Sequence, residues 1–562
     1  MGAEMKMISQ CDFCGKIKKV KRIAEKYVCE ECYEKTCLNN AALYGYEWWL
    51  EALNFQHEYE NSVDRIVAKE IKKITDKFKD VQIQKEKLLE DLEQEIKVRL
   101  EFYRKDEIFV ALLTIKEGIR RSLLMKNSNQ DWSVISDAST VNLLMKLTSE
   151  ICNFENHFMY ELEEKCSNFV NAIFYARRYN MIKENIDIMY GKNIQLKDIC
   201  FEPIPTDETD RYFDLYLENG LDEKPEDYKI QNKVLLKKLE AEDKTPDKIL
   251  EGLSNLLSIE FGLTKEKYQV LSYGLLRMEF PTKKDFNEFI DGKKGLFEAE
   301  PVFVMEKAFL QSICGEEMLE ALLNTFSINR NIANRKVKEL ELFCFYEVGE
   351  LVVVGNFDYA QTISVFEKFL LSGHYIDVYK QNVSQHKEIR KAQNTLSKYF
   401  SASVADYLLS CGYDLPMETY LGIEIPRAEI EKIDVQGKNI LISEHNKKLG
   451  DIDVLALNQE KKEILIFELK FYKPAISMND MLLRDRSLVE SKEVFRHMKE
   501  REEAVRQNVD EVVKFILGES RSEYTVKSIL LTARANYYGV QEKEVDYLTW
   551  TQFLEKAKRK EI

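Results

Sequence analysis

The stretch from residue 450 to residue 470 constrains the fold of this sequence more than any other part. Two segments rich in branched apolar residues, 450–457 and 464–470, are separated by the polar gap 458–463. Apolar runs of this length predict buried strands, and a gap of this length suits a loop that joins them. We therefore expect a buried β-hairpin in the C-terminal third of the chain.

Charged residues interrupt both strands of this predicted hairpin. Asp451 and Asp453 lie in the first strand, and Glu468 and Lys470 lie in the second. Since residues i and i+2 of a strand share a face, the members of each pair emerge side by side. Charges inside apolar runs are unfavourable unless they are paired or hold a metal. Carboxylates favour Mg²⁺ or Mn²⁺, which can activate water against a phosphodiester, and Lys470 can stabilise charge on the phosphate oxygens.

The pattern of Gly-Asp-Ile-Asp, a hairpin gap and Glu-Leu-Lys resembles the PD-(D/E)xK nuclease superfamily, which has the restriction-endonuclease-like fold. The resemblance covers about a third of the chain, over residues 386–562. It implies that Asp453 and Glu468 bind a catalytic Mg²⁺ or Mn²⁺ together with the backbone carbonyl of Leu469, and that Lys470 is the catalytic lysine. Asp451 is a secondary candidate, because relatives with a Gly-Glu-Ile-Asp pattern carry Glu at this position.

The segments that flank the hairpin extend the resemblance. We predict helices over 391–411 and 501–517, a strand over 526–532, and a strand-to-helix turn over 548–557, which gives the order α, β, β, β, α, β. The helix over 501–517 contains Gln507. Relatives often place a glutamine there, facing the site, so Gln507 is a further candidate catalytic residue.

One feature departs from the superfamily pattern. Many relatives carry a metal-binding glutamate in the opening helix, but the corresponding stretch 400–404 has no carboxylate. Glu424 and Glu429 are available as substitutes from the first strand. Without a substitute the metal site would be incomplete, which leaves room for an inactive nuclease fold.

Four cysteines near the start of the chain form a C-x2-C-x14-C-x2-C pattern. Four thiolates at this spacing match the tetrahedral preference of Zn²⁺, and four protein ligands leave no open position on the metal. We therefore predict a structural zinc ribbon over residues 1–38, with an iron–sulfur cluster or free thiols as alternatives. Its loop is rich in Lys and Arg and could contact nucleic acid or a protein. The four cysteines are Cys11, Cys14, Cys29 and Cys32.

The composition limits the compartment in which the protein can function and the partners that it can bind. The other seven of the 11 cysteines are scattered, which argues against an oxidising compartment. We find neither a secretory signal nor an apolar run long enough to cross a bilayer, so we expect a cytoplasmic protein without membrane contact. The net charge of −15 does not favour binding of nucleic acid over the whole surface, but it permits a local basic groove.

Scarce proline and glycine and a helical apolar periodicity predict a mainly α, multidomain protein. We expect a helical domain with a candidate coiled coil over 39–200, a linker or irregular segment over 201–248, and a helical domain with a β-hairpin over 249–385. An α/β restriction-endonuclease-like domain follows over 386–562. Within the first helical domain, one long amphipathic helix is predicted from the stripe Ile71, Ile74, Phe78, Val81, Leu88 and Leu92.

These features predict a divalent-metal-dependent nuclease that acts on DNA more readily than on RNA, because most of the superfamily acts on DNA. A nuclease domain behind a large helical region is similar to prokaryotic defence or restriction effectors. The alternative is a non-enzymatic adaptor or nucleic-acid-binding protein, built from the zinc ribbon, the helices and a degenerate nuclease fold. Nucleic acid is the expected partner, and a protein partner or a homodimer is a further option.

Overall fold

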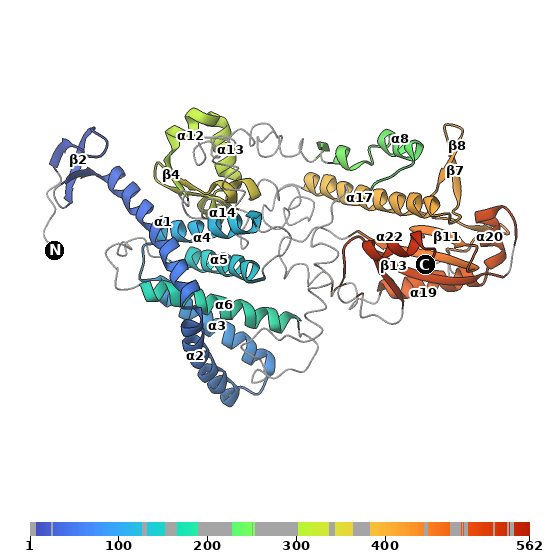
Figure 1. Ribbon diagram of the computed structural model, residues 1–562, viewed down its shortest axis with the longest axis horizontal. Coiled ribbons are helices and arrows are strands. Elements are labelled where there is room, and N and C mark those ends of the chain that lie inside the picture. Colours follow the sequence, from blue (N-terminus) through green and yellow to red (C-terminus); the bar gives the residue numbers. More distant parts are fainter. Residues whose placement is uncertain are drawn as a thin grey trace. The chain divides into compact units, whose positions relative to one another are not determined.

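Two compact units make up the chain in the computed structural model. One consists of Met1–Pro203 and Leu257–Phe366, and the other of Ile204–Leu256 and Glu367–Ile562. The protein is mainly helical, with several small sheets (Figure 1). The residues that the structure describes are 7–23, 26–125, 132–151, 166–188, 228–249, 251–252, 302–335, 343–362, 383–442, 448–471, 485, 487, 493–520, 523–536, 539 and 545–562.

The first unit begins with a small three-stranded antiparallel sheet in the order β1-β2-β3. Its core is formed by Cys11, Val20, Val28 and Cys29. A core of this size is marginal on its own, so a metal held by the neighbouring cysteines would add needed stability. The elements are β1 (Met7–Gln10), β2 (Ile17–Ile23), β3 (Lys26–Cys29) and the following helix α1 (Glu30–Asn54).

Further helices form the body of the first unit. Helix α1 packs against α4, and α3 packs against α6. The buried side chains of these helices are mostly aliphatic and aromatic, as expected for amphipathic helices that share one core. The helices are α2 (Gln56–Lys77), α3 (Val81–Leu100), α4 (Lys105–Met125), α5 (Trp132–Glu150) and α6 (Cys166–Ile188).

The prediction of one long helix across residues 71–92 is wrong, because the chain leaves the helical conformation between α2 and α3. Phe78 has an extended backbone, and the Asp80 side chain accepts a hydrogen bond from the Ile83 amide at 3.0 Å. Asp is a favourable N-cap residue, so it starts a second helix where the apolar stripe alone suggests continuity. Of the stripe residues within the helices, Ile71, Ile74, Leu88 and Leu92 are buried, and Val81 at the start of α3 is half-buried.

The predicted β-hairpin around Gly349 is confirmed, and it gains a third strand. Strand β5 pairs with β6 through a turn in which Gly349 has φ 55, and β4 pairs with the other edge of β6. The elements of this region are β4 (Phe303–Glu306), α12 (Lys307–Cys314), α13 (Glu316–Phe326), α14 (Ile328–Arg335), β5 (Phe345–Val348) and β6 (Leu351–Val354).

Buried polar contacts join this sheet to the helical body. Glu117 of α4 accepts hydrogen bonds from the amides of Phe357 and Asp358, at 3.0 and 2.7 Å, and Lys116 Nζ lies 3.0 Å from the Asp358 carboxylate. Regions that we expected to form two separate helical domains, 39–200 and 249–385, therefore contribute to one compact unit.

The second unit is built on a four-stranded sheet in the order β11-β12-β13-β14. Strands β11 and β12 form the predicted antiparallel hairpin, whereas β12, β13 and β14 are parallel. Helices α17 and α22 pack on one face, and α19 and α20 pack on the other (Figure 1). The elements are α17 (Val383–Ser410), β11 (Val454–Asn458), β12 (Glu463–Lys470), α19 (Glu493–Arg506), α20 (Val509–Leu517), β13 (Thr525–Thr532), β14 (Asp546–Thr549) and α22 (Trp550–Lys558).

The helix predicted over 501–517 is two helices, since α19 ends at Arg506 and α20 begins at Val509. The segment predicted as a linker also differs from expectation, because its described residues 228–248 contribute Tyr228, Ile230, Leu235 and Leu239 to the core of this unit. Tyr228 is buried and its hydroxyl donates to the Ala533 carbonyl at 3.0 Å. Helix α8 (Lys233–Ala241) adds two buried leucines, so a short amphipathic helix lies inside a stretch whose prolines and acids suggested irregular structure.

A second hairpin lies beside the outer edge of β11. It is formed by β7 (Met417–Tyr420) and β8 (Ile423–Pro426), and the chain on either side of it bridges to β11 and to Ile452 just before β11. One bridge joins Asp414 to Leu457, and the other joins Ile430 to Ile452. A short ladder of β9 (Asp434–Val435) and β10 (Lys438–Asn439) follows.

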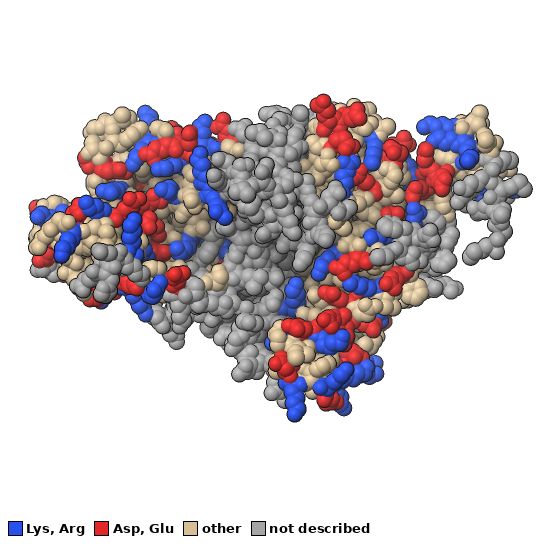
Figure 2. Space-filling model, turned by 180° about the vertical axis from the view of Figure 1, so that it is seen from behind, with Lys and Arg blue, Asp and Glu red and all other residues tan. Residues whose placement is uncertain are grey.

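Acidic and basic side chains are interspersed on the face of the molecule drawn in Figure 2. The net charge of −15 is thus not gathered into one acidic block among the described residues of that face. None of the described helices combines the length and the apolar character needed to span a membrane.

Candidate functional site

The β11–β12 hairpin brings the predicted site residues together. The antiparallel ladder pairs Val454 with Phe467, so one step further along it Asp453 lies opposite Glu468. Leu469 is buried among the helices α17 and α22. Since side chains alternate along a strand, Glu468 and Lys470 point to the opposite face, which α19 covers.

The Asp453 carboxylate is half-buried and is held by the backbone of the neighbouring strand. The Leu469 amide donates to Oδ2 of Asp453 at 2.6 Å. Burial raises the pKa of Asp453 to about 7, and the charge of Glu468 acts in the same direction, against the opposing effects of the Leu469 amide and Lys470. A carboxyl group with this pKa is partly protonated at neutral pH and ionises fully when a cation binds it.

Glu468 is bound by two cations of the chain itself. Lys470 Nζ lies 2.6 Å from Oε1, and the Arg501 guanidinium binds Oε2. Glu468 and Arg501 are buried, with 8% and 5% of their surface exposed, whereas Lys470 is only half-buried. A buried carboxylate requires such partners, and a metal ion at Glu468 would have to share or replace them.

Arg501 is a site residue that the sequence analysis missed. Its Nη1 also donates to the Asp451 carbonyl at 2.8 Å, so it connects both strands of the hairpin to α19. Gly450, with φ 87, allows this approach, because a Cβ atom there would lie 3.0 Å from Nη1. The signal that could have found Arg501 is its place in the buried stripe of α19, with Phe495, Met498 and Val505.

Gln507 is not brought to this site. Helix α19 ends at Arg506, and Gln507 follows it with an exposed side chain that donates to Glu503 at 2.9 Å. Asp451, the secondary candidate, is also exposed, although its charge contributes to the raised pKa of Asp453.

Neither proposed substitute for the helix glutamate has its carboxylate bonded to the site. Glu424 is exposed on β8 and bonds to Thr419. Glu429 donates its backbone amide to the Asp453 carbonyl at 2.8 Å, but its carboxylate pairs with Lys398 of α17 at 3.2 Å. In the opening helix, the hydroxyls of Ser401 and Ser403 bond to carbonyls of their own helix. The departure noted in the sequence therefore persists in the structure.

The candidate metal ligands at the hairpin are of the type that a hard divalent cation prefers, but they are few. Asp453 and Glu468 offer carboxylate oxygens, and Leu469, which directly follows Glu468, offers a carbonyl oxygen, so that the candidate ligands are all oxygen. Within the part of the chain that the structure describes, three or more metal-binding side chains gather only at the four cysteines.

The four predicted cysteines lie together in the N-terminal module. The sulfurs of Cys11, Cys14, Cys29 and Cys32 are all within 4.8 Å of one another, a separation at which one ion could be bound by all four. Burial opposes ionisation of Cys11, but amides of Cys29, Cys14 and Phe13 donate toward its sulfur and lower its pKa to about 6. Burial raises the pKa of Cys29 and Cys32, so among these three cysteines only Cys11 is stabilised as a thiolate by the chain itself.

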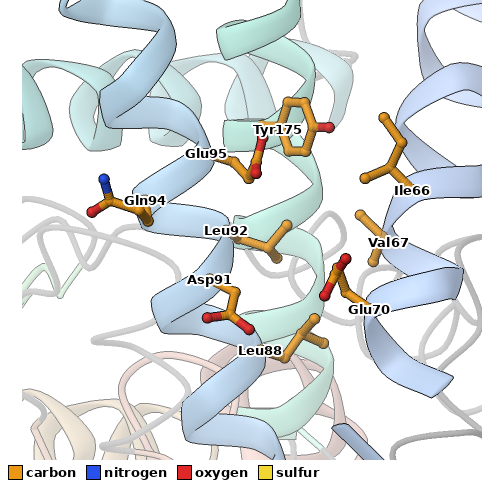
Figure 3. Close-up of a pocket in the computed structure, with 9 residues that line it drawn as sticks. All are labelled: Ile66, Val67, Glu70, Leu88, Asp91, Leu92, Gln94, Glu95 and Tyr175. Atoms are coloured by element: carbon orange, nitrogen blue, oxygen red, sulfur yellow. The ribbon is translucent and has the colours of Figure 1, made fainter. Parts of the chain in front are cut away.

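A pocket of about 270 Å³ lies between α2, α3 and α6 of the first unit (Figure 3). Its three carboxylates are already paired with cations on their own helices, Glu70 with Lys73, Asp91 with Lys87, and Glu95 with Arg99. The remaining lining is largely aliphatic, from Ile66, Val67, Leu88 and Leu92, with Gln94 and Tyr175. We assign no ligand to this pocket.

In comparisons with protein-family models, with curated proteins and with solved structures, nothing matched this chain. The function is therefore inferred from the chemistry of the residues described above.

Proposed function

We propose that the second unit is a divalent-metal-dependent nuclease of the PD-(D/E)xK type, which hydrolyses phosphodiester bonds of DNA in preference to RNA. One observation carries the proposal. Asp453 and Glu468 are neighbours across an antiparallel pair, and Lys470 shares their face of the sheet and contacts Glu468 at 2.6 Å. Two carboxylates and a lysine in this arrangement form a set that phosphodiester hydrolysis can use.

Each residue has a role in this proposal. Asp453, Glu468 and the Leu469 carbonyl would hold Mg²⁺ or Mn²⁺, which when bound supplies Lewis-acid polarisation of the phosphate. Lys470 reaches solvent from a half-buried position, so it can hold a water molecule or stabilise charge on a phosphate oxygen. Arg501 keeps the Glu468 carboxylate in place from the other side.

The strands around the site support the same proposal. A helix, the β11–β12 hairpin, further helices and then two parallel strands follow one another, with helices on both faces of a mixed sheet. The order differs from the α, β, β, β, α, β predicted from the resemblance in two ways, because two helices replace the single one predicted after Lys470 and two strands follow these helices.

The test is incubation of the purified protein with plasmid, linear duplex and single-stranded DNA in Mg²⁺ or Mn²⁺. We expect cleavage that stops when the divalent ion is withheld, and that falls by about 100-fold or more in Lys470→Ala, the range typical for loss of a group that stabilises transition-state charge. Lys461→Ala is a matched control, because Lys461 is exposed in the loop at the opposite end of the hairpin. Equal cleavage by wild type and Lys470→Ala would exclude the role given to Lys470.

A specific observation favours the alternative of a non-catalytic, nucleic-acid-binding fold. Both oxygens of Glu468 are engaged by Arg501 and Lys470, and the described part of the opening helix adds no carboxylate to the site from residues 400–404. A tight complex with nucleic acid and no turnover in Mn²⁺ would support this alternative over the nuclease.

For the N-terminal module we propose a structural Zn²⁺ bound by all four cysteines. The closeness of the sulfurs supports it, and four protein ligands would leave no coordination position for a substrate. Metal analysis of the purified protein tests this proposal, with about one zinc per chain expected and none in Cys11→Ser/Cys29→Ser.

A further inference from the structure

The N-terminal module has exposed positive charges that are not paired with the described acidic groups of the chain. Lys16, Lys19, Arg22 and Lys26 are all exposed, and none of them forms an ion pair within the described residues of the chain. Figure 2 shows basic side chains gathered over this module, at the upper right of the view. Such a concentration in a chain of net charge −15 is a local departure from the overall balance.

Two of the three acidic groups in the two Cys-x-x-Cys segments are paired within the module, and the third, Glu30, is exposed. Glu31 binds Lys18 at 2.6 Å, and this contact is the main cause of the raised pKa of Lys18, with contributions from the nearby cysteines. The Asp12 carboxylate accepts a hydrogen bond from the Tyr27 amide at 2.5 Å. The four exposed cations are therefore available to an external anion.

Apolar side chains are exposed beside these cations. Ile17 is 77% exposed, and it lies two residues from Lys19 on β2, so the two side chains share a face of the sheet. Phe13 is 54% exposed, and Lys26 Nζ lies 5.1 Å from the centre of its ring. Exposed apolar and aromatic groups between cations suit a ligand that offers both phosphates and flat base surfaces.

We propose that the basic surface of this module, formed by Phe13, Lys16, Ile17, Lys19 and Lys26 and continued by Arg22 on the other side of β2, binds a single strand of nucleic acid. The cations would contact phosphates, and Phe13 would stack on a base that is not paired. A duplex hides its bases, and the exposed cations of the module lie on short strands and their turns, not on a helix that could enter the major groove. Binding at this surface does not depend on cleavage at the hairpin.

The test uses the full chain in its zinc-loaded form, with Lys470→Ala added so that cleavage cannot remove the probe. Fluorescence anisotropy measures binding of a labelled single strand of about 20 nucleotides, and of the same strand in a duplex, over a series of salt concentrations. In K16Q/K19Q/R22Q/K26Q, the slope of log affinity against log salt should fall by about 3, since each phosphate contact to a single strand contributes about 0.7. Phe13→Ala should lower single-strand affinity about 10-fold and leave the slope unchanged.

A matched control removes the same charge elsewhere. Neutralisation of Lys69, Lys72, Lys77 and Lys79, which are exposed on and just after α2, should leave the salt slope unchanged. Zinc content is measured for every variant, so that loss of binding is read only from chains whose module is intact. Three results would overturn the proposal. The first is that the parent chain binds no nucleic acid, which would favour a protein partner, and the second is that both neutralised variants behave alike. The third is that the duplex is preferred and Phe13→Ala has no effect. Failure of wild type to cleave DNA would contradict the proposed nuclease but not this binding surface.

Discussion

The cysteine cluster and the hairpin site gather metal-binding groups in different ways. The four sulfurs come from two short turns, so the spacing of the cysteines largely determines that they meet. At the hairpin, Asp453 and Glu468 meet through the register of β11 and β12, and Arg501 arrives from a helix some 30 residues later in the chain. The first site is therefore local and separable, whereas the second depends on how several elements of its unit pack.

The largest effect is expected from removing the metal of the N-terminal module. A structural zinc site contributes roughly 10 kcal/mol to folding, and the core of this module is too small to replace it. Chelation should therefore open residues 7–29 to amide hydrogen exchange and leave the sheet of the second unit protected. Loss of protection in β12 and β13 under the same treatment would contradict the separability of the two sites.

Arg501→Ala tests the dependence of the hairpin on the packing around it. It leaves Glu468 buried with Lys470 as its remaining partner, and breaking a buried pair from one side typically costs about 3–5 kcal/mol. We expect a loss in the lower part of that range in urea unfolding of the second unit, because Lys470 compensates in part.

Two further variants distinguish loss of the Glu468–Arg501 ion pair from general destabilisation of α19. Arg506→Ala removes an exposed arginine from the same helix and should change stability by less than about 1 kcal/mol. The double variant Glu468→Gln/Arg501→Met removes both charges and should recover much of the stability lost in Arg501→Ala. If the double variant is no more stable than Arg501→Ala, Arg501 acts through its packing and not through the carboxylate.

The same contrast explains what the sequence could predict. The strands of the hairpin and the shared face of Glu468 and Lys470 follow from apolar patterning and alternation, which are local properties, whereas the meeting of Asp453 with Glu468 depends on the register of β11 and β12. Arg501 could not be assigned to Glu468, because an arginine in an apolar stripe identifies a buried position and not its partner. The described residues 228–248 were expected in a linker for a similar reason, since the packing of Tyr228 near Ala533 is a contact between distant parts of the chain.

The pKa of Asp453 predicts a pH dependence of stability. In the folded chain its pKa is raised from 3.8 to about 7, so between these values the folded state binds more protons than the unfolded state. Stability should therefore fall as the pH rises from about 4 to about 7, by an amount of the order of a few kcal/mol. Asp453→Asn should remove this fall in urea unfolding followed across the pH range without added metal, and an unchanged profile would contradict the environment described for Asp453.

The smallest effect is expected for a substitution of Gln507. This variant tests most directly whether the superfamily resemblance or the geometry of the structure describes the role of Gln507. The superfamily pattern places a glutamine in this helix facing the site, whereas here Gln507 follows the end of α19 and its amide donates to Glu503 in solvent. Gln507→Ala should therefore change the cleavage rate by less than about 2-fold, as expected for a surface residue. Arg501→Lys, which keeps the charge but not the two-pronged contact with Glu468 and the Asp451 carbonyl, should lower the rate more than Gln507→Ala does. The reverse order would mean that the catalytic arrangement places Gln507 at the hairpin after all, and that the end of α19 must rearrange when nucleic acid binds.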